Sequence, residues 1–312
     1  MYKSWSYRKT RRFKGGPVCA PDEAAILAQM MPAFNIAAPQ PRAVGPVIFS
    51  TPHSGRIYPR EWMARCRLTV NGLRAAEDAF VDELFCDVAN LGAPLLRARF
   101  PRSFVDVNRA PDELAPDWDG AAEPATARAQ AGLGVIPLAI GQDKPIYKAS
   151  EDIGPHARAR LDALYHPYHA ALRGLIAAAK AQFGYAVLID CHSMPGFGPL
   201  HKRRPDFILG DGFGQSCGPH IIEPCERDLR GLGYSLVRNH PYAGGYITRH
   251  YGQPGVDVHV LQVEINRDLY LNPVTIGKKP GFDKLQSDMT ELARRLIARH
   301  RPQAQITDIA AE

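Results

Sequence analysis

The chain has 312 residues, of which 45% are apolar and 22% are charged, as is typical of a globular protein with one large domain or two small ones. Lysine and arginine exceed aspartate and glutamate by six, but six basic residues lie within residues 1–14, so the remainder is nearly neutral and no nucleic-acid partner is indicated. No run of about 18 consecutive apolar residues occurs, so no membrane span is predicted.

The six cysteines are scattered along the chain without the short spacings of a metal-binding knuckle. In a chain of this length, that pattern favours reduced thiols in a cytoplasmic protein. The arginine pair at residues 11 and 12 is followed by a Gly-Gly-Pro stretch and not by an apolar segment, so we expect no export signal.

Residues 1–43 are rich in proline, alanine and basic residues, and we expect them to form an arm that wraps the surface or stays mobile. The remaining chain, 44–312, is predicted to be a single domain. Its first strand is the apolar run at 47–50. A helix over 71–92 is predicted because apolar residues recur there at spacings of three and four. Extended segments at 94–100 and 103–109 follow, and the polar stretch 110–144 is expected to carry loops over the sheet edge.

The second half of the chain alternates strands with helices. Helical periodicity covers 159–183, where Pro167 should kink the helix or break it in two. Further strands are predicted at 184–190, 206–211, 234–239 and 258–271, and further helices at 214–233 and 282–300. This alternation predicts one three-layer α/β/α domain with a mainly parallel or mixed central sheet.

Polar side chains directly follow three of the predicted extended segments. His53 follows the strand at 47–50, Asn108 and Arg109 follow the extended segment at 103–109, and His192 follows the strand at 184–190. Glu264 lies inside an otherwise apolar strand. In an α/β sheet the carboxyl ends of strands open into the crevice where ligands bind. These residues therefore predict a functional crevice.

Two histidines and a carboxylate are the protein ligands of many hydrolytic zinc sites, which keep one position for water. His53 and His192 would supply two ligands. The third is expected from the helix after the first ligand, where Asp78 and Asp82 are four residues apart and share a face. Glu77 is disfavoured because its spacing places it nearer the apolar stripe. The sequence leaves the choice between Asp78 and Asp82 open.

Glu264 is the candidate general base, because a buried carboxylate beside a dication can accept a proton from water. Arg102 and Arg109 carry guanidinium groups suited to carboxylate recognition. Their presence predicts a small anionic substrate.

Several motifs, arriving in order over about residues 45–300, resemble the N-formylglutamate amidohydrolase family, whose members look like distant relatives of the zinc carboxypeptidases and aspartoacylase. The motifs are TPHSGRIYP, AEDAFVDEL, RSFVDVNRAPDEL, LIDCHSMPGFG, LGDGFG, NHPYAGGYITRHYG and VLQVEINRDLYL. The resemblance implies a zinc-carboxypeptidase-like fold for a single catalytic domain over 44–312.

Carried over residue by residue, the resemblance implies that His53, Asp78 and His192 hold one zinc ion. It further implies that Glu264 activates water and that Arg102 helps to polarise the scissile carbonyl. The compact H-x-x-E motif of zinc carboxypeptidases is absent here, because Arg56 stands three residues after His53.

The implied substrate site contains Asn108 and Arg109, which resemble an Asn-Arg pair that grips a substrate's α-carboxylate. A loop at 242–252, in which Gly244 and Gly245 permit close backbone approach, is expected to close over the ligand. His240, Thr248 and Arg249 are further candidates in or beside this loop.

The implied reaction is the hydrolysis of an N-acyl amino acid, with N-formyl-L-glutamate giving formate and L-glutamate. Two alternatives stay open. One is a carboxypeptidase-like or other N-acyl amino acid hydrolase with a different side-chain preference. The other is a non-catalytic binding protein on the same scaffold.

Overall fold

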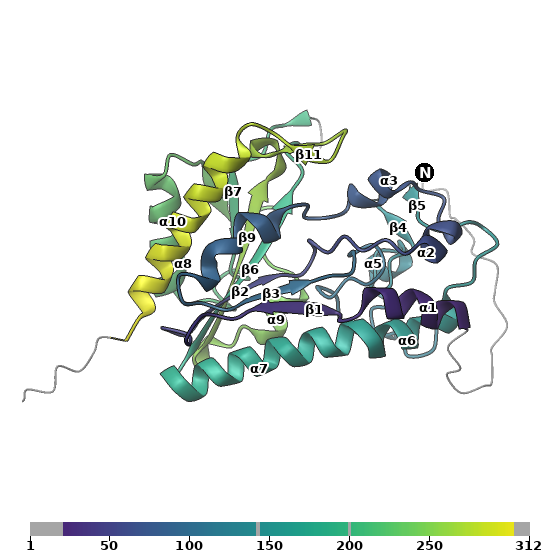
Figure 1. Cartoon of the computed structure of the whole chain (residues 1–312), viewed down its shortest axis with the longest axis horizontal. Helices are drawn as coiled ribbons and strands as arrows, with labels where there is room; N and C mark the ends of the chain where they lie inside the picture. The colour runs from purple at the N-terminus through teal and green to yellow at the C-terminus, as the bar shows by residue number, and fades with distance from the viewer. Residues whose placement is uncertain (1–20, 142–143, 199–200, 303–312) are drawn as a thin grey trace, which may run out of the picture.

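The computed structural model describes residues 21–141, 144–198 and 201–302 (Figure 1). Seven strands in this part of the chain form one sheet in the order β1-β3-β2-β6-β9-β7-β8. Their bounds are β1 Phe34–Ala37, β2 Val47–Thr51, β3 Leu95–Ala98, β6 Ala186–Met194, β7 Phe207–Gly210, β8 Leu236–Arg238 and β9 Val258–Asn266. Two small pairs lie outside this sheet, β4 (Ala139–Ile140) with β5 (Lys144–Pro145) and β10 (Leu271–Asn272) with β11 (Gly277–Lys278).

The sheet is mixed, as the alternation of strands and helices predicted. Strands β3, β2, β6 and β9 run parallel, β1 and β7 join them antiparallel, and β8 is parallel to β7. The C-terminal ends of β2, β6 and β9 therefore meet at one edge of the sheet. An edge of this kind is where α/β folds place their ligands.

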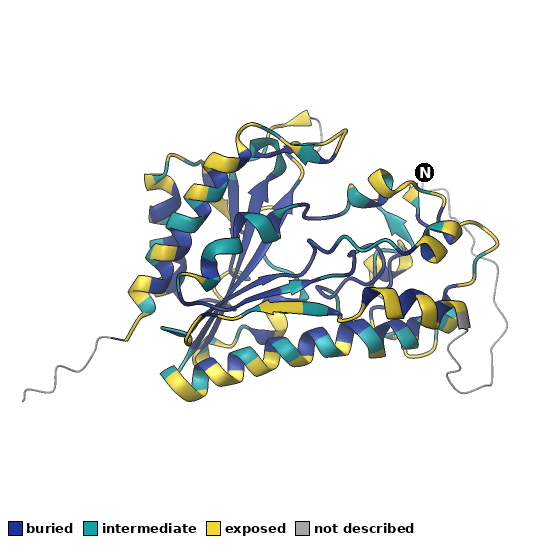
Figure 2. Ribbon diagram, viewed as in Figure 1, coloured by how far each residue is buried: buried dark blue, intermediate teal, exposed yellow. Residues whose placement is uncertain are grey.

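Helices cover both faces of the sheet, which confirms the α/β architecture (Figure 1). The helices are α1 Pro21–Met30, α2 Arg60–Arg65, α3 Val70–Arg74, α4 Val81–Leu84, α5 Ala127–Gln130, α6 Ala157–Arg160, α7 His166–Phe183, α8 Pro219–Gly231, α9 Tyr246–Tyr251 and α10 Phe282–His300. One apolar core contains side chains of α1, α7 and α9, and the other contains side chains of α4, α8 and α10. Strands β2, β6, β7 and β9 are buried along their whole length, whereas the edge strands β1 and β8 are partly exposed (Figure 2). Among the described helices, none has the length and apolar content needed to cross a membrane.

The predicted interruption at Pro167 takes the form of a π-helical segment. Helix α6 continues into π-helical turns at Leu161–Tyr165 and then into α7, so the helical path is unbroken. Pro167 is the second residue of α7, which directly follows the π-helical turns. A change of hydrogen-bond register before proline is a common way for a helix to pass it.

The prediction of one continuous helix over 71–92 is wrong. The segment forms α3, a turn, α4 and a short 3-10 helix at Cys86–Ala89. Phe80 lies in the turn with a positive φ of 64°, which ends helical propagation. Its ring packs against Phe282 of α10, at 6.3 Å between ring centroids. Tertiary packing therefore overrides the local helical spacing.

The segment 103–109 is not a strand either. It consists of turns, although Val105 and Val107 are fully buried. The backbone N–H of Asp106 donates to the carbonyl of Val135 at 2.8 Å, so the segment 110–144 packs against it. Apolar side chains in this case indicate a buried loop, which periodicity alone cannot distinguish from a strand.

Residues 21–43 belong to the folded domain, contrary to the expectation of an arm that ends at residue 43. Strand β1 pairs with β3 as an edge of the main sheet. On α1, Ile26 and Met30 are fully buried in the core. The predicted boundary between residues 43 and 44 therefore separates parts of one sheet. The rest of the expected arm, residues 1–20, lies outside the described residues.

Candidate metal centre and active site

Alternation along three neighbouring strands places polar side chains on one face of the sheet near its C-terminal edge. On this face, each of the strands β2, β6 and β9 carries apolar side chains near its N-terminal end and polar side chains near its C-terminal end. The polar ones are Ser50, Asp190, His192, Gln262 and Glu264. Strand register sets Ser50 beside Asp190, Asp190 beside Gln262, and His192 beside Glu264. Because strand side chains alternate between faces, these five residues share one surface.

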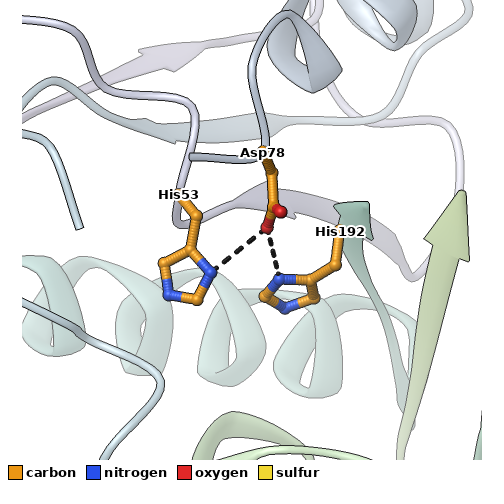
Figure 3. Close-up of side chains that lie close together, drawn as sticks. All are labelled: His53, Asp78 and His192. Atoms are coloured by element: carbon orange, nitrogen blue, oxygen red, sulfur yellow. Dashed lines mark hydrogen bonds and ion pairs between the residues drawn. The ribbon is translucent and has the colours of Figure 1, made fainter. Parts of the chain in front are cut away.

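His53, Asp78 and His192 converge at this edge (Figure 3). Nδ1 of His53 lies 3.2 Å from Oδ2 of Asp78, and Nδ1 of His192 lies 2.9 Å from the same oxygen. One ligand atom from each of the three lies within 4.8 Å of the others, and all three residues are buried. Two imidazole nitrogens and one carboxylate oxygen are a ligand set suited to zinc and other first-row divalent ions.

The backbone of Asp78 is fastened to the first ligand loop. Its N–H donates to the carbonyl of His53 at 3.1 Å, and the hydroxyl of Ser54 donates to its carbonyl at 2.9 Å. Asp78 lies in the turn before α4, and not on a helix face as expected. The structure therefore brings Asp78 to the histidines through contacts with their own loop.

The neighbouring acids make other contacts. Asp82 pairs with Arg56 at 2.5 Å. Glu77 accepts a hydrogen bond from Tyr58 and another from Arg74, the latter at 3.0 Å. Among the described residues, neither of these carboxylates contacts His53 or His192, so Asp78 is the acid that the structure places with the histidines.

Two further carboxylates stand behind the histidines, and the sequence analysis did not assign them. Nε2 of His53 lies 2.7 Å from Asp106, and Nε2 of His192 lies 2.8 Å from Asp190. An imidazole that donates Nε2–H to a carboxylate presents the lone pair of Nδ1 to a metal ion. Asp190 could have been found from the sequence, because it precedes His192 by two residues on a strand and so shares its face.

The electrostatic surroundings of the three ligands also favour a cation. Burial opposes a charged imidazolium, yet Asp190 and Asp78 raise the pKa of His192 well above its usual value. Burial likewise opposes ionisation of Asp78, but hydrogen bonds from His192 and His53 hold the pKa of its carboxyl well below the usual range. An ionised Asp78 between two imidazoles therefore stabilises a positive species at this position, either a proton or a metal ion. The donor set fits a divalent metal ion.

Glu264 lies beside the proposed ligands, on the strand next to His192. Burial raises the pKa of Glu264 to about 7, with the attraction of His192 opposing the rise. Gln262 donates a hydrogen bond to Oε1 of Glu264 at 2.9 Å and accepts one from the N–H of Gly245 at 2.8 Å. Gln262 was not assigned from the sequence. It connects the acid to the loop at 242–252.

Arg102 and Arg109 both face Asp106. Arg102 donates to Asp106 at 2.8 Å, which is its one hydrogen bond within the described residues. Nη2 of Arg109 is 3.8 Å from the same carboxylate, while Nε and Nη1 donate to the carbonyls of Leu133 and Asn108. Arg102 thus keeps donors available, whereas Arg109 uses two of its groups to hold the backbone.

Asn108 is buried between the metal ligands and the glycine loop. Its amide nitrogen is 3.3 Å from Nε2 of His192, and its amide oxygen accepts from the N–H of Ile247 at 2.8 Å. A Cβ atom at Gly245 would overlap the side chain of Asn108, so only glycine permits this contact. Gly244 has a φ of 128°, which also favours glycine. Gly245 therefore packs directly on Asn108, and Gly244 packs on Thr248.

The further candidates in or beside the loop at 242–252 differ in burial and in the residues they contact. Thr248 is fully buried, and its hydroxyl lies 3.5 Å from Gln262. Arg249 is exposed and donates to the carbonyl of Gly244 at 3.0 Å. His240 packs its ring on exposed Phe213, with 5.7 Å between centroids. The structure therefore associates Thr248 with the site and places His240 in another contact.

Comparison with known proteins adds independent information. Residues 45–271 match the family model described as N-formylglutamate amidohydrolase. The chain belongs to the N-formylglutamate amidohydrolase family. A Pseudomonas aeruginosa protein named N-formylglutamate deformylase is 35% identical over 236 residues, which cover 73% of this chain and 82% of that protein. A Pseudomonas putida protein of the same name is 33% identical over 200 residues, covering 62% and 70% of the two chains.

A solved structure of a family member and a second solved structure have similar folds. The crystal structure of N-formylglutamate amidohydrolase from Ralstonia eutropha is 33% identical and gives a TM-score of 0.78, covering 86% of this chain and 98% of that one. An Agrobacterium tumefaciens protein that is 18% identical gives a TM-score of 0.63, which shows a similar fold. The resemblance read from the motifs is thus confirmed at the level of the family.

Proposed function

We propose that this protein hydrolyses N-formyl-L-glutamate to formate and L-glutamate at one zinc ion held by His53, Asp78 and His192. The convergence of these three ligands beside Glu264 carries the proposal. Membership of the amidohydrolase family and the names of the relatives from Pseudomonas support the choice of substrate. A divalent ion at this place would polarise the formyl carbonyl and lower the pKa of water.

Glu264 acts as the general base and then as the general acid. It takes a proton from the attacking water as the oxygen bonds to the formyl carbon. It delivers that proton to the amide nitrogen as the C–N bond breaks, so formate and a free amine are formed. A pKa near 7 suits both transfers at neutral pH. The hydrogen bond from Gln262 holds one carboxylate oxygen and leaves the other for the proton.

Arg102 stabilises the negative charge that develops on the formyl oxygen. Its one hydrogen bond within the described residues goes to Asp106, so its other N–H groups can reach substrate. Asn108 and Arg109 hold the α-carboxylate, with Arg109 contributing mainly its charge because two of its groups bind backbone carbonyls. Gly244 and Gly245 allow the loop at 242–252 to approach the bound ligand.

The test is a substrate panel with zinc-loaded protein. We expect formate release from N-formyl-L-glutamate to exceed hydrolysis of N-acetyl amino acids and of short peptides. No formate release under these conditions would overturn the assignment, and preferential hydrolysis of another panel member would favour the alternative N-acyl substrate. A zinc-free protein whose His53→Ala and His192→Ala variants behave like wild type would favour the non-catalytic alternative.

A further inference from the structure

Arg267 lies just after β9 and reaches back to the turn that carries Asp78. Its Nη2 donates to Oδ1 of Asp78 at 3.1 Å, and its Nη1 donates to the carbonyl of Ala75 at 3.0 Å. Its Nε donates to the hydroxyl of Ser193 at 2.9 Å. One guanidinium group therefore connects the Asp78 turn to the ends of β6 and β9.

The hydroxyl of Ser193 links Arg267 to Asp78 by hydrogen bonds. It accepts from Arg267 and donates to Oδ1 of Asp78 at 3.0 Å. Oδ1 is thus occupied by two donors, while Oδ2 faces Nδ1 of His53 and of His192. The two oxygens of one carboxylate have separate partners. An acid held in this way offers a metal ion a single oxygen in a fixed orientation.

The hydrogen bonds of Arg267 also argue against a role in gripping substrate. Each of its three nitrogens donates to the protein, whereas Arg102 makes a single such bond among the described residues. The Arg267 side chain is 15% exposed, and its partner Asp78 is 1% exposed. Its charge and its donors are committed to the Asp78 turn.

We propose that Arg267, acting through Oδ1 of Asp78 together with Ser193, is a positioning residue that orients this acid as a one-oxygen metal ligand. The inference rests on the metal centre of the proposed function. Groups that hydrogen-bond metal ligands in this way raise metal affinity, and their loss typically weakens binding by about 10- to 100-fold.

The test measures zinc affinity directly, by competition with a chromophoric chelator. We expect Arg267→Gln to raise the zinc Kd about 10- to 100-fold, and Ser193→Ala to raise it by a smaller factor. Arg267→Lys should recover part of the loss, because it keeps the charge but not the planar set of donors. Arg294→Gln, which removes an exposed pair with Glu291 on α10, is the matched control and should bind zinc like wild type.

Two further measurements separate positioning from general destabilisation. Urea unfolding of the metal-free variants reports stability, and the visible spectrum of the cobalt-substituted proteins reports ligand geometry. We expect the cobalt spectrum of Arg267→Gln and of Ser193→Ala to change while that of Arg294→Gln does not. Should Arg267→Gln fail to fold, Ser193→Ala carries the same test.

The outcomes distinguish this inference from the proposed function. If the wild-type protein binds zinc and the Arg267 and Ser193 variants keep the same zinc affinity and cobalt spectrum, the positioning role alone is overturned. Wild-type protein that binds no zinc would overturn the proposed metal centre and the positioning role with it. Weaker zinc binding accompanied by a changed cobalt spectrum supports the inference.

Discussion

At the residue scale, the carboxylate of Asp78 divides its oxygens between two tasks. One oxygen accepts hydrogen bonds from Ser193 and Arg267, and the other faces the two histidines. The neighbouring acid Asp82 has Arg56 as its partner instead. The difference between the two acids lies in their partners and not in their residue type.

Replacing each acid by its amide tests this difference. Asp78→Asn should lose zinc on dialysis, because a neutral amide oxygen replaces the charged ligand, and formate release should fall with it. Asp82→Asn should keep one zinc ion per chain. Elemental analysis after dialysis measures both proteins. Equal zinc content in the two variants would contradict the assignment of Asp78.

Glu264 permits a separation of chemistry from metal binding. Glu264→Gln removes the proton acceptor while keeping shape and hydrogen bonding to Gln262, so zinc content should stay unchanged. The kcat for N-formyl-L-glutamate should fall about 10²- to 10⁴-fold. Steady-state kinetics on zinc-loaded protein measure this. An active Glu264→Gln variant would remove Glu264 from the proton-transfer role.

At the element scale, one buried histidine, His169, joins α7 to the buried segment 103–109 and to α9. Nε2 of His169 donates to the carbonyl of Val107 at 2.9 Å, and Nδ1 accepts from Tyr251 at 2.8 Å. Both bonds use the neutral imidazole. Burial lowers the pKa of His169 to about 3, against an ordinary value of 6.5.

This shift predicts an acid sensitivity with a definite sign. Between pH 6.5 and about 3 the unfolded chain binds a proton at His169 that the folded chain does not. The free energy of unfolding should therefore fall as the pH falls through that window, by at most about 1.4 kcal/mol per pH unit from this residue. His169→Gln cannot titrate, so its unfolding free energy should vary less between pH 7 and 4.5.

Urea unfolding of metal-free protein at several pH values measures the difference. Removing the metal from both proteins keeps the titration of metal ligands out of the comparison. Parallel pH dependences for wild type and His169→Gln would show that His169 is not the source of the acid sensitivity.

At the scale of the whole molecule, a buried ion network ties the N-terminal helix to the domain. Glu23 of α1 is fully buried and accepts from Arg160 at 2.6 Å and from Arg65 at 2.8 Å. These arginines come from α6 and α2, so three separate segments meet at one carboxylate. Removing a single partner from a buried pair leaves an uncompensated charge.

The network gives a prediction with a control in the adjacent residue. Glu23→Ala should lower the free energy of unfolding by about 3–5 kcal/mol, because the buried guanidinium of Arg160 loses its carboxylate partner and Arg65 loses one of its partners. Asp22→Ala should have a much smaller effect, because Asp22 is 59% exposed and surface ion pairs contribute little. Chemical denaturation compares the two. Equal losses would show that the buried network does not hold α1 to the domain.

The sequence by itself determined the α/β class, most of the strands and the place of the site. Most of the apolar runs form buried strands, and polar residues at their C-terminal ends must meet at one edge when strands are parallel. His53, His192 and Glu264 could therefore be selected from local pattern alone. The order of the motifs along the chain also indicates the family.

Only the tertiary structure decided which acid joins the histidines and what stands behind them. Helical spacing alone does not distinguish Asp78 from Asp82 as a metal ligand, because the partners of both acids come from other segments of the chain. The contacts of Asp106 with His53 and of Arg267 with Asp78 span 53 and 189 residues of sequence. Side-chain periodicity records only local geometry, so contacts between distant segments become visible only when the chain is folded.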